Sequence, residues 1–132
     1  MLFRSILEGE AADRRAVPWF DPAWYRAEYH VAPDDLALAH YLRHRHTRQV
    51  SPNPLFDVAW YIEQHADEVA GNRDPFAHFL QTGTYRDIDP SPAFSAAEYR
   101  KRHLGRPSRL FRQMMHPDRD NPLVHHLRAE YR

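Results

Sequence analysis

The chain has 132 residues, no cysteine, a formal net charge of zero, and 13% aromatic residues. This length fits one domain with its own core, and the lack of cysteine excludes disulfides and thiolate zinc sites. No apolar run approaches the ~20 residues of a membrane helix, and the charged start is unlike a signal peptide. We therefore expect a soluble, cytoplasmic protein, and the sequence indicates no cofactor.

Residues 1–15 carry four apolar side chains at helical spacing, ahead of a polar stretch: Leu2, Phe3, Ile6 and Leu7. The spacing predicts a short amphipathic lead-in helix. This helix would either cap the first structural unit or bind a partner. Capping is the preferred interpretation, because the terminal units of a repeat array must hide an apolar face.

Two short phrases recur three times after residue 15. In the first, a phenylalanine precedes a helix-capping residue, and a tyrosine follows five residues after the phenylalanine. In the second, a histidine is followed by a ring-bearing residue and a leucine. The phenylalanines are Phe20, Phe56 and Phe94, and the histidines are His40, His78 and His125. Each phrase is typical of a capped amphipathic helix, so the two together predict a helix-turn-helix unit.

The spacing of the phrases sets the period. The phenylalanines are 36 and 38 residues apart and the histidines 38 and 47, so the third unit carries an insertion of about nine residues. Such a period is typical of helix-hairpin repeats. The predicted fold is all-α: one domain, residues 1–132, with three helix-turn-helix repeats of about 36–47 residues after the N-terminal capping helix. The repeats are expected at residues 16–51, 52–89 and 90–132.

Local signals refine this interpretation. Asp34 or Asp35 is expected to cap the second helix of the first repeat. Gly83 is expected to end a helix in the left-handed conformation. Trp24, Trp60 and the tyrosines are expected in the core rather than on a sugar-stacking surface, with Phe20 packed on Trp24 or Tyr25 about one turn later.

The phrases F-D-x-x-W-Y, D/N-P-x-x-H-[YF]-L and P-x-P-x-F resemble tandem repeats found beside bacterial glycosyltransferases and rhamnan-synthesis-type proteins of cell-surface polysaccharide assembly. The resemblance is closer over residues 20–94 than over residues 94–127, where Ser95 and Glu98 replace the usual Asp and Trp. It implies an accessory helical segment without catalysis. No catalytic residue is carried over.

The repeated histidines His40, His78 and His125 are the first candidate site. A ladder of imidazoles could contact a metal, a glycan or phosphate. Successive units in a helical stack lie about 10 Å apart, whereas zinc needs ligands at about 2 Å, so one shared metal is disfavoured. The preferred interpretation is that each imidazole packs in its hairpin and donates to a carbonyl or cap of the adjacent linker.

Two further sets of residues could contact a ligand or partner. Trp19 lies outside the repeated phrases and could be exposed for stacking on a sugar. Arg100, Lys101 and Arg102 form a basic run. Residues 1–95 hold 9 basic and 14 acidic side chains (−5), and residues 96–132 hold 9 and 4 (+5). This asymmetry suggests head-to-tail self-association or docking of the basic end on an anionic partner.

The sequence shows no phosphate-binding glycine loop, paired carboxylates or Ser/His/Asp set. We therefore expect a non-catalytic interaction or scaffold module, associated with bacterial surface-polysaccharide synthesis, whose partner is another protein or a second copy. One alternative is a glycan-binding module that uses Trp19 and the repeated histidines. A metal-dependent enzyme is a further alternative. No nucleic-acid-binding motif accompanies the basic run.

Overall fold

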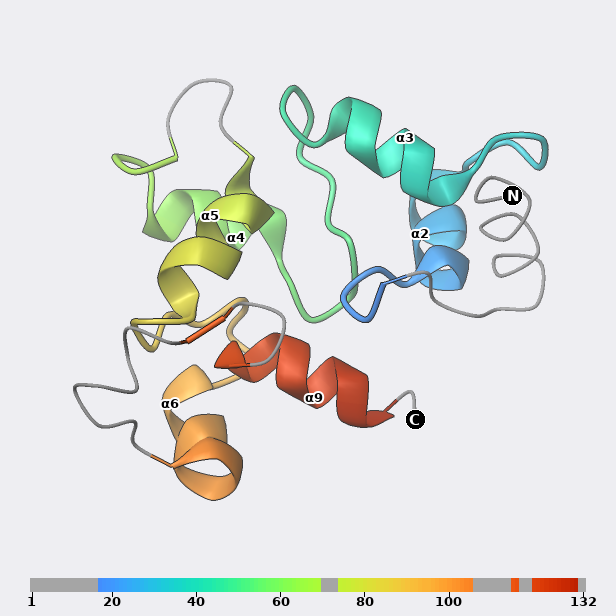
Figure 1. Ribbon diagram of the computed structural model, residues 1–132. Helices are drawn as coiled ribbons and strands as arrows, with labels where there is room; N and C mark the ends of the chain where they lie inside the picture. The colour runs from blue at the N-terminus through green and yellow to red at the C-terminus, as the bar shows by residue number, and fades with distance from the viewer. Residues whose placement is uncertain (1–16, 70–73, 106–114, 117–119, 131–132) are drawn as a thin grey trace.

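The computed structural model describes residues 17–69, 74–105, 115–116 and 120–130, and this part of the chain is helical, without a strand (Figure 1). The all-α prediction is confirmed for these residues, whereas the expected helix at residues 1–15 lies outside them. The elements are α2 (Pro22–Tyr29), α3 (Ala37–His44), α4 (Val58–Gln64), α5 (Pro75–Gly83), α6 (Ala96–Tyr99), the π-helix η1 (Arg100–Leu104), which continues α6, and α9 (Pro122–Glu130).

The helices pack in three pairs, α2 with α3, α4 with α5, and α6 with α9. Figure 1 shows the first pair in blue to cyan on one side, the second in green to yellow on the other, and the third in orange to red below them. Short helices of this kind are marginal alone in water. Packing within and between the pairs must therefore supply their stability.

Side-chain caps start the first helix of each pair. Oδ1 of Asp21 accepts from the N–H of Trp24 at 3.1 Å, and Oδ1 of Asp57 accepts from the N–H of Trp60 at 3.1 Å. Oγ of Ser95 accepts from the N–H of Glu98 at 3.3 Å. Each cap satisfies an N–H that has no partner inside the helix.

The start of α3 and the end of α5 differ from expectation. The N-cap of α3 is Leu36, which makes no side-chain cap, so the predicted aspartate cap is wrong. The predicted left-handed end at Gly83 is also wrong: Gly83 is the last residue of α5, and the following Thr84 stays right-handed. A Cβ at Gly83 would lie 3.1 Å from the Phe79 ring, so this glycine permits close packing.

Two aromatic clusters form the core. One surrounds α2 and α3 and includes Phe20, Tyr25 and Tyr41. The other joins the second and third pairs, and it consists of Phe56, Val58, Tyr61, Val69, Phe76, Phe79, Ile88, Leu123 and Leu127. The expected core position is reached only in part by the tryptophans: Trp24 and Trp60 are half-buried, and Trp24 packs against the first cluster. The tyrosines one residue later, Tyr25 and Tyr61, are fully buried.

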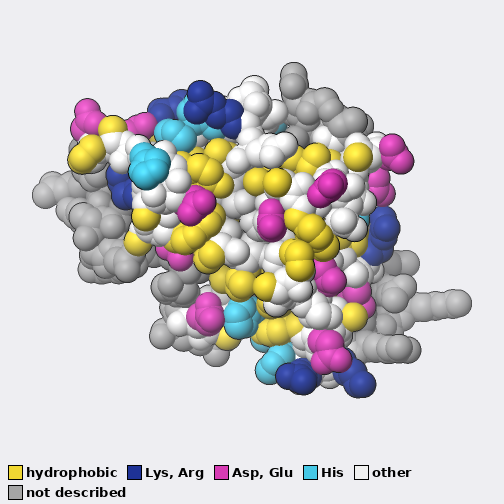
Figure 2. Space-filling view, turned by 180° about the vertical axis from the view of Figure 1, so that it is seen from behind, with side chains coloured by type: hydrophobic (Ala, Val, Ile, Leu, Met, Phe, Trp, Pro, Cys, Tyr) yellow, Lys and Arg dark blue, Asp and Glu magenta, His cyan; other side chains and the backbone are white. Residues whose placement is uncertain are grey.

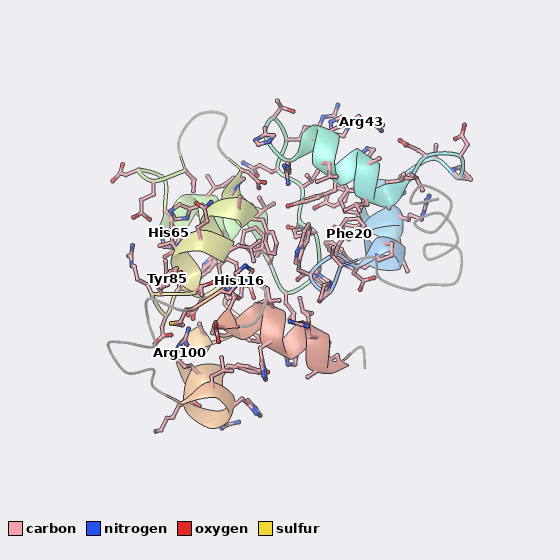
Figure 3. All side chains as sticks on the ribbon, viewed as in Figure 1. Phe20, Arg43, His65, Tyr85, Arg100 and His116 are labelled. Atoms are coloured by element: carbon pink, nitrogen blue, oxygen red, sulfur yellow. The ribbon has the colours of Figure 1, made fainter. Side chains whose placement is uncertain are left out.

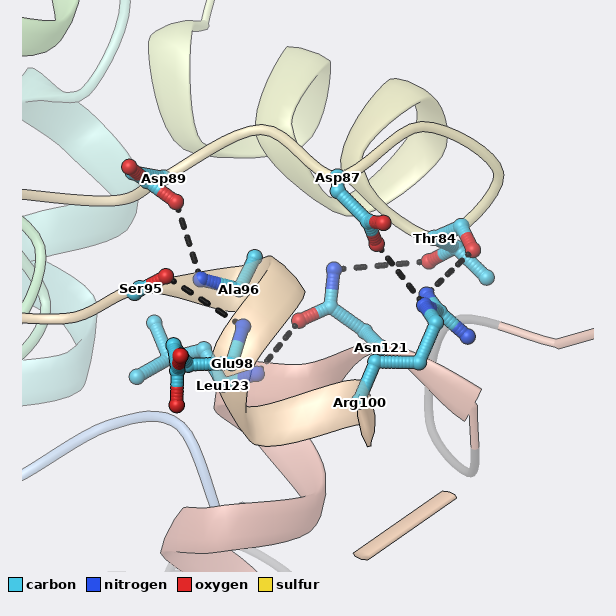
Figure 4. Close-up of polar contacts among 9 residues, drawn as sticks. All are labelled: Thr84, Asp87, Asp89, Ser95, Ala96, Glu98, Arg100, Asn121 and Leu123. Carbon is cyan, nitrogen blue, oxygen red and sulfur yellow. Dashed lines mark hydrogen bonds and ion pairs between the residues drawn. The ribbon is translucent and has the colours of Figure 1, made fainter. Parts of the chain in front are cut away.

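The proline-containing linkers bond to the helix pairs on both sides. The carbonyl of Pro52 accepts from the N–H of Asp21, and the carbonyl of Pro90 accepts from the N–H of Asp57, both at 3.0 Å. Each linker also reaches the next helix: Asp89 Oδ1 accepts from the N–H of Ala96 at 2.8 Å (Figure 4). A linker therefore fixes one pair against the next through directional bonds.

Candidate functional site

A tyrosine and a histidine are hydrogen-bonded in the same way in each helix pair. The hydroxyl–Nδ1 distance is 2.7 Å in the first pair and 2.6 Å in the second and third. The tyrosine comes from the first helix of the pair and the histidine from the second. The partners are Tyr25 with His40, Tyr61 with His78, and Tyr99 with His125.

Burial sets the protonation of these pairs. It raises the pKa of the hydroxyls of Tyr25, Tyr61 and Tyr99 above the usual value, so the hydroxyls keep their protons. Burial also lowers the pKa of His40, with a further contribution from the positive charge of His44. A neutral imidazole accepts at one ring nitrogen. In the first pair we therefore assign the Tyr25 hydroxyl as donor to Nδ1 of His40, and we expect the same roles in the other two pairs.

The three candidate histidines do not meet at one site, because each belongs to a different helix pair. Nδ1 of each histidine contacts a tyrosine of its own pair. Each imidazole therefore packs within its pair, and donation from a ring nitrogen to a linker carbonyl or cap stays a prediction. In the described part of the chain, no three His, Asp or Glu side chains are placed to hold a metal ion.

The second pair extends its tyrosine–histidine contact into a longer polar chain. Oε2 of Glu68 lies 3.4 Å from Nε2 of His78 and 3.4 Å from Nδ1 of His65, and Oε1 lies 3.5 Å from Arg86. The ring of His65 lies 4.5 Å from that of Tyr61. Figure 3 shows His65 beside α4. One carboxylate thus links two imidazoles and a guanidinium, and this arrangement connects the segment after α4 to α5.

The basic segment at the end of α3 is largely paired. Arg43 contacts Asp35 at 2.6 Å, and Arg45 contacts Asp74 at 3.2 Å. The hydrogen bond from Arg43 lowers the pKa of the Asp35 carboxyl. The ring of His44 lies 4.4 Å from that of His40. These contacts connect the end of α3 to the loop before it and to the start of α5.

Trp19 lies between the two core clusters and packs against both. Its ring centroid is 6.0 Å from that of Tyr41 in the first pair and 5.2 Å from that of Phe76 in the second. Its backbone carbonyl accepts from Asn53 Nδ2 at 2.8 Å. Trp19 is therefore half-buried at a junction between pairs, where its ring is occupied by protein contacts.

The basic run divides into one buried and two exposed residues. Arg100 is buried, and it donates to Asp87 at 2.8 Å and to the carbonyl of Thr84 at 3.0 Å (Figure 4). Lys101 and Arg102 are exposed, and Arg102 lies 3.6 Å from Glu98. Arg100 thus joins the third pair to the second, which leaves Lys101 and Arg102 on the surface.

The negative excess of residues 1–95 can be assigned to one helix pair. Residues 52–95 hold 2 basic and 7 acidic side chains, so the whole excess of five negative charges lies in the second helix pair and its linkers. This pair adjoins the basic third pair, and the bond between Arg100 and Asp87 joins them. One pair of opposite charges therefore meets across this junction.

No family model, curated protein or solved structure matches the chain. Within the described ranges, none of the helices has the length and apolarity needed to cross a membrane.

The Asn-Pro context of Asn121 predicts a cap of the last helix, and this prediction is confirmed: Asn121 accepts from the N–H groups of Leu123 and Val124. Asn53 lies outside the sequence-based expectation, and it accepts from the N–H groups of Leu55 and Phe56. Both side chains are fully buried. Asn121 also reaches Thr84 at 3.4 Å. The tyrosine–histidine contact could have been predicted from the sequence, because a tyrosine and a histidine recur together in every unit.

Proposed function

We propose that the chain is a non-catalytic helical-repeat module that acts by binding another protein. The observation that carries the proposal is the tyrosine–histidine hydrogen bond, which joins the two helices of every pair at 2.6–2.7 Å. The imidazoles and hydroxyls that would be the natural reactive groups hold helices together instead. The same three-ring arrangement surrounds each bond: Phe20, Tyr25 and Tyr41; Phe56, Tyr61 and Phe79; Phe94, Tyr99 and His126.

The linkers support a repeat interpretation as well. Corresponding linker prolines accept from corresponding cap residues, and corresponding positions before α4 and α6 cap the first residue of each helix: Ser51 Oγ accepts from Val58, and Asp89 Oδ1 accepts from Ala96. The first pair has Pro22 at this position, which has no N–H to satisfy. Units joined in this way form an extended surface of the kind that repeat proteins use for binding.

The biological setting rests on the sequence resemblance. The repeated phrases resemble segments beside glycosyltransferases of bacterial surface-polysaccharide synthesis, and we propose an accessory role of that type. The test is purification of the tagged chain from its native cells, with quantitative mass spectrometry of the bound proteins. Enrichment of a glycosyltransferase or polysaccharide-assembly protein is expected. Release of sugar from a nucleotide sugar by the purified chain alone would contradict the proposal.

Glycan binding is the second candidate function, and the half-buried aromatic residues of the third pair favour it there. Phe94, Tyr99 and His126 are half-buried, whereas their counterparts in the first two pairs are at most 1% exposed: Phe20, Tyr25, Tyr41, Phe56, Tyr61 and Phe79. Titration with polysaccharide fragments, followed through the ring resonances of Tyr99, tests this candidate. Unchanged resonances at saturating fragment concentration would remove it.

A further inference from the structure

We propose that the first helix pair carries a binding site for a carboxylate supplied by a partner protein, formed by Nε2 of His40 and the guanidinium of Arg48. The inference rests on the proposed function and names the chemistry of the partner. Its basis is a comparison with the second helix pair, where the chain fills the corresponding place with a carboxylate of its own, that of Glu68.

In the second pair, Glu68 joins a histidine to an arginine. Oε2 of Glu68 lies 3.4 Å from Nε2 of His78, and Oε1 lies 3.5 Å from Nη1 of Arg86. The other ring nitrogen of His78 contacts the hydroxyl of Tyr61 at 2.6 Å. The two oxygens of one carboxylate therefore complete a chain of polar contacts that starts at the buried tyrosine.

The first pair repeats the histidine and the arginine of this chain. Arg48 follows His40 by eight residues, as Arg86 follows His78. The backbone places both arginines alike, because the N–H of each donates to the carbonyl four residues before it, at 2.8 Å in the first pair and 3.0 Å in the second. The carbonyl of each also accepts from the N–H two residues later. Arg48 thus has the same position in its pair as Arg86.

The carboxylate has no counterpart in the first pair. Among the residues that the structure describes, no Asp or Glu forms an ion pair with His40 or Arg48. Asp35 does not fill the place, because its Oδ2 contacts Arg43 at 2.6 Å. Nδ1 of His40 accepts from Tyr25, so Nε2 carries a proton, and those residues supply no acceptor for it. The imidazole and the Arg48 guanidinium are therefore two donors that lack the acceptor found in the second pair.

The surroundings of His40 are positively charged. Burial lowers the pKa of His40, and the positive charge of His44 adds to this effect. Arg43 and Arg48 act in the same direction, and Asp35 opposes them. The ring of His44 lies 4.4 Å from that of His40. Figure 2 shows Lys or Arg side chains gathered with histidines at the upper edge of the molecule. Such surroundings attract an anion.

A carboxylate of a partner protein is the occupant that matches these two donors. One carboxylate can accept charge-assisted hydrogen bonds from an imidazole and a guanidinium at the same time, and Glu68 is placed in this way in the second pair. The surrounding cations repel a metal ion, and a neutral sugar gains nothing from their charge. Arg48 is exposed, so a Glu or Asp side chain of another protein can reach it.

A titration of the full chain with sodium acetate, at constant pH and ionic strength, tests the site. The ring nitrogen-15 resonances of His40 and His78 are recorded by NMR. We expect a saturable shift at Nε2 of His40 and none at His78, whose carboxylate is already in place. In Glu68→Ala, acetate should also shift Nε2 of His78, because the place of that carboxylate is then empty.

Two matched variants assign the role of the arginine. Arg48→Gln should weaken the binding of acetate at His40 about tenfold, since a hydrogen bond from a charged donor is lost. Arg86→Gln changes the corresponding exposed position of the second pair and should leave the response of His40 unchanged. Circular dichroism of every variant verifies its folding.

Two peptides and inorganic phosphate separate the possible sources of the anion. A short peptide of alternating Glu and Ala is expected to saturate His40 at a lower concentration than acetate, because it offers several carboxylates. The same peptide with Gln in place of Glu should cause no shift. Phosphate is expected to bind more weakly than the Glu peptide.

Three results would overturn the inference: a His40 resonance that acetate does not saturate, an unchanged response in Arg48→Gln, and tighter binding of phosphate than of the Glu peptide. Co-purification repeated with Arg48→Gln separates the inference from the proposed function. Loss of the bound partner is expected. A partner protein that Arg48→Gln retains in full would leave the interaction role intact and contradict the carboxylate site.

Discussion

The hydroxyl of Tyr61 and Nδ1 of His78 lie 2.6 Å apart and join α4 to α5 inside the second aromatic cluster. Tyr61 is fully buried, and its ring also contacts Phe56 and Phe79. A hydroxyl in this position must keep a partner, because a buried polar group without a hydrogen bond costs free energy. The bond therefore fixes the position of α4 relative to α5 and also stabilises their packing.

Tyr61→Phe is expected to lower the free energy of unfolding by about 1–3 kcal/mol, because it leaves Nδ1 of His78 without its partner. Tyr99→Phe should cost less, since Tyr99 is half-buried and water can replace its hydroxyl. Urea denaturation measures both, with Tyr85→Phe as control, because Tyr85 is 47% exposed and water can replace its hydroxyl's bond to the carbonyl of Met115. Equal stability of Tyr61→Phe and the unmodified chain would contradict the architectural role.

Acidification is expected to destabilise the first helix pair through His40. Its pKa is lowered, first by burial and then by the positive charge of His44, so the folded state binds fewer protons than the unfolded state. The stabilisation is complete above the unfolded pKa of about 6.5 and is lost as the pH falls below it.

The measurement compares urea denaturation at pH 7 and pH 5 for the unmodified chain and His40→Gln, which cannot take up the proton. The loss of stability on acidification should be smaller in His40→Gln. A larger or equal loss in the variant would show that protonation of His40 does not oppose folding. His30→Gln, at an exposed position of the same helix pair, serves as control.

The helix pairs were predictable because local rules act within a few residues. Asp21, Asp57 and Ser95 cap helices as their sequence context predicts, since a cap needs only its own side chain and N–H groups three residues away. The expected aspartate cap of α3 failed because the helix begins after Leu36, one residue beyond the aspartates, and the Asp35 side chain pairs with Arg43.

The direction of side chains and the contacts between units could not be predicted from the sequence. The sequence predicts both the tryptophan and the tyrosine of α2 and α4 as core residues, but only Tyr25 and Tyr61 are fully buried, because adjacent residues of a helix do not face the same way. The burial of Arg100 depends on Asp87 and Thr84, which lie 13 and 16 residues away. No local pattern encodes such a partner.

Asn121→Ala is expected to destabilise the fold more than Asp57→Ala. Both remove an N-cap, which costs about 0.5–2 kcal/mol. Asn121 is also fully buried, so its removal leaves the N–H groups of Leu123 and Val124 without their acceptor at buried positions, whereas Asp57 is exposed. Thermal and urea unfolding of the two variants measure the difference, and an equal loss would show that Asn121 acts only as a cap.

Gly83→Ala is expected to destabilise the protein, although alanine favours helices by about 1 kcal/mol over glycine. The new Cβ would lie 3.1 Å from the Phe79 ring, and that ring is 1% exposed inside the larger core cluster and has no room to move. The double variant Gly83→Ala, Phe79→Leu should recover part of the loss. A stabilised single variant would mean that the core adapts easily at this junction.

The central claim is that one tyrosine–histidine bond is used three times as architecture. Nitrogen-15 NMR of the histidine rings, in the unmodified chain and in the three variants Tyr25→Phe, Tyr61→Phe and Tyr99→Phe, tests it most directly. At neutral pH we predict that His40, His78 and His125 all carry their proton on Nε2 and accept at Nδ1, and that each variant shifts the Nδ1 resonance of its own partner alone. Different tautomers among the three histidines, or Nδ1 resonances that ignore the loss of the hydroxyl, would contradict the account.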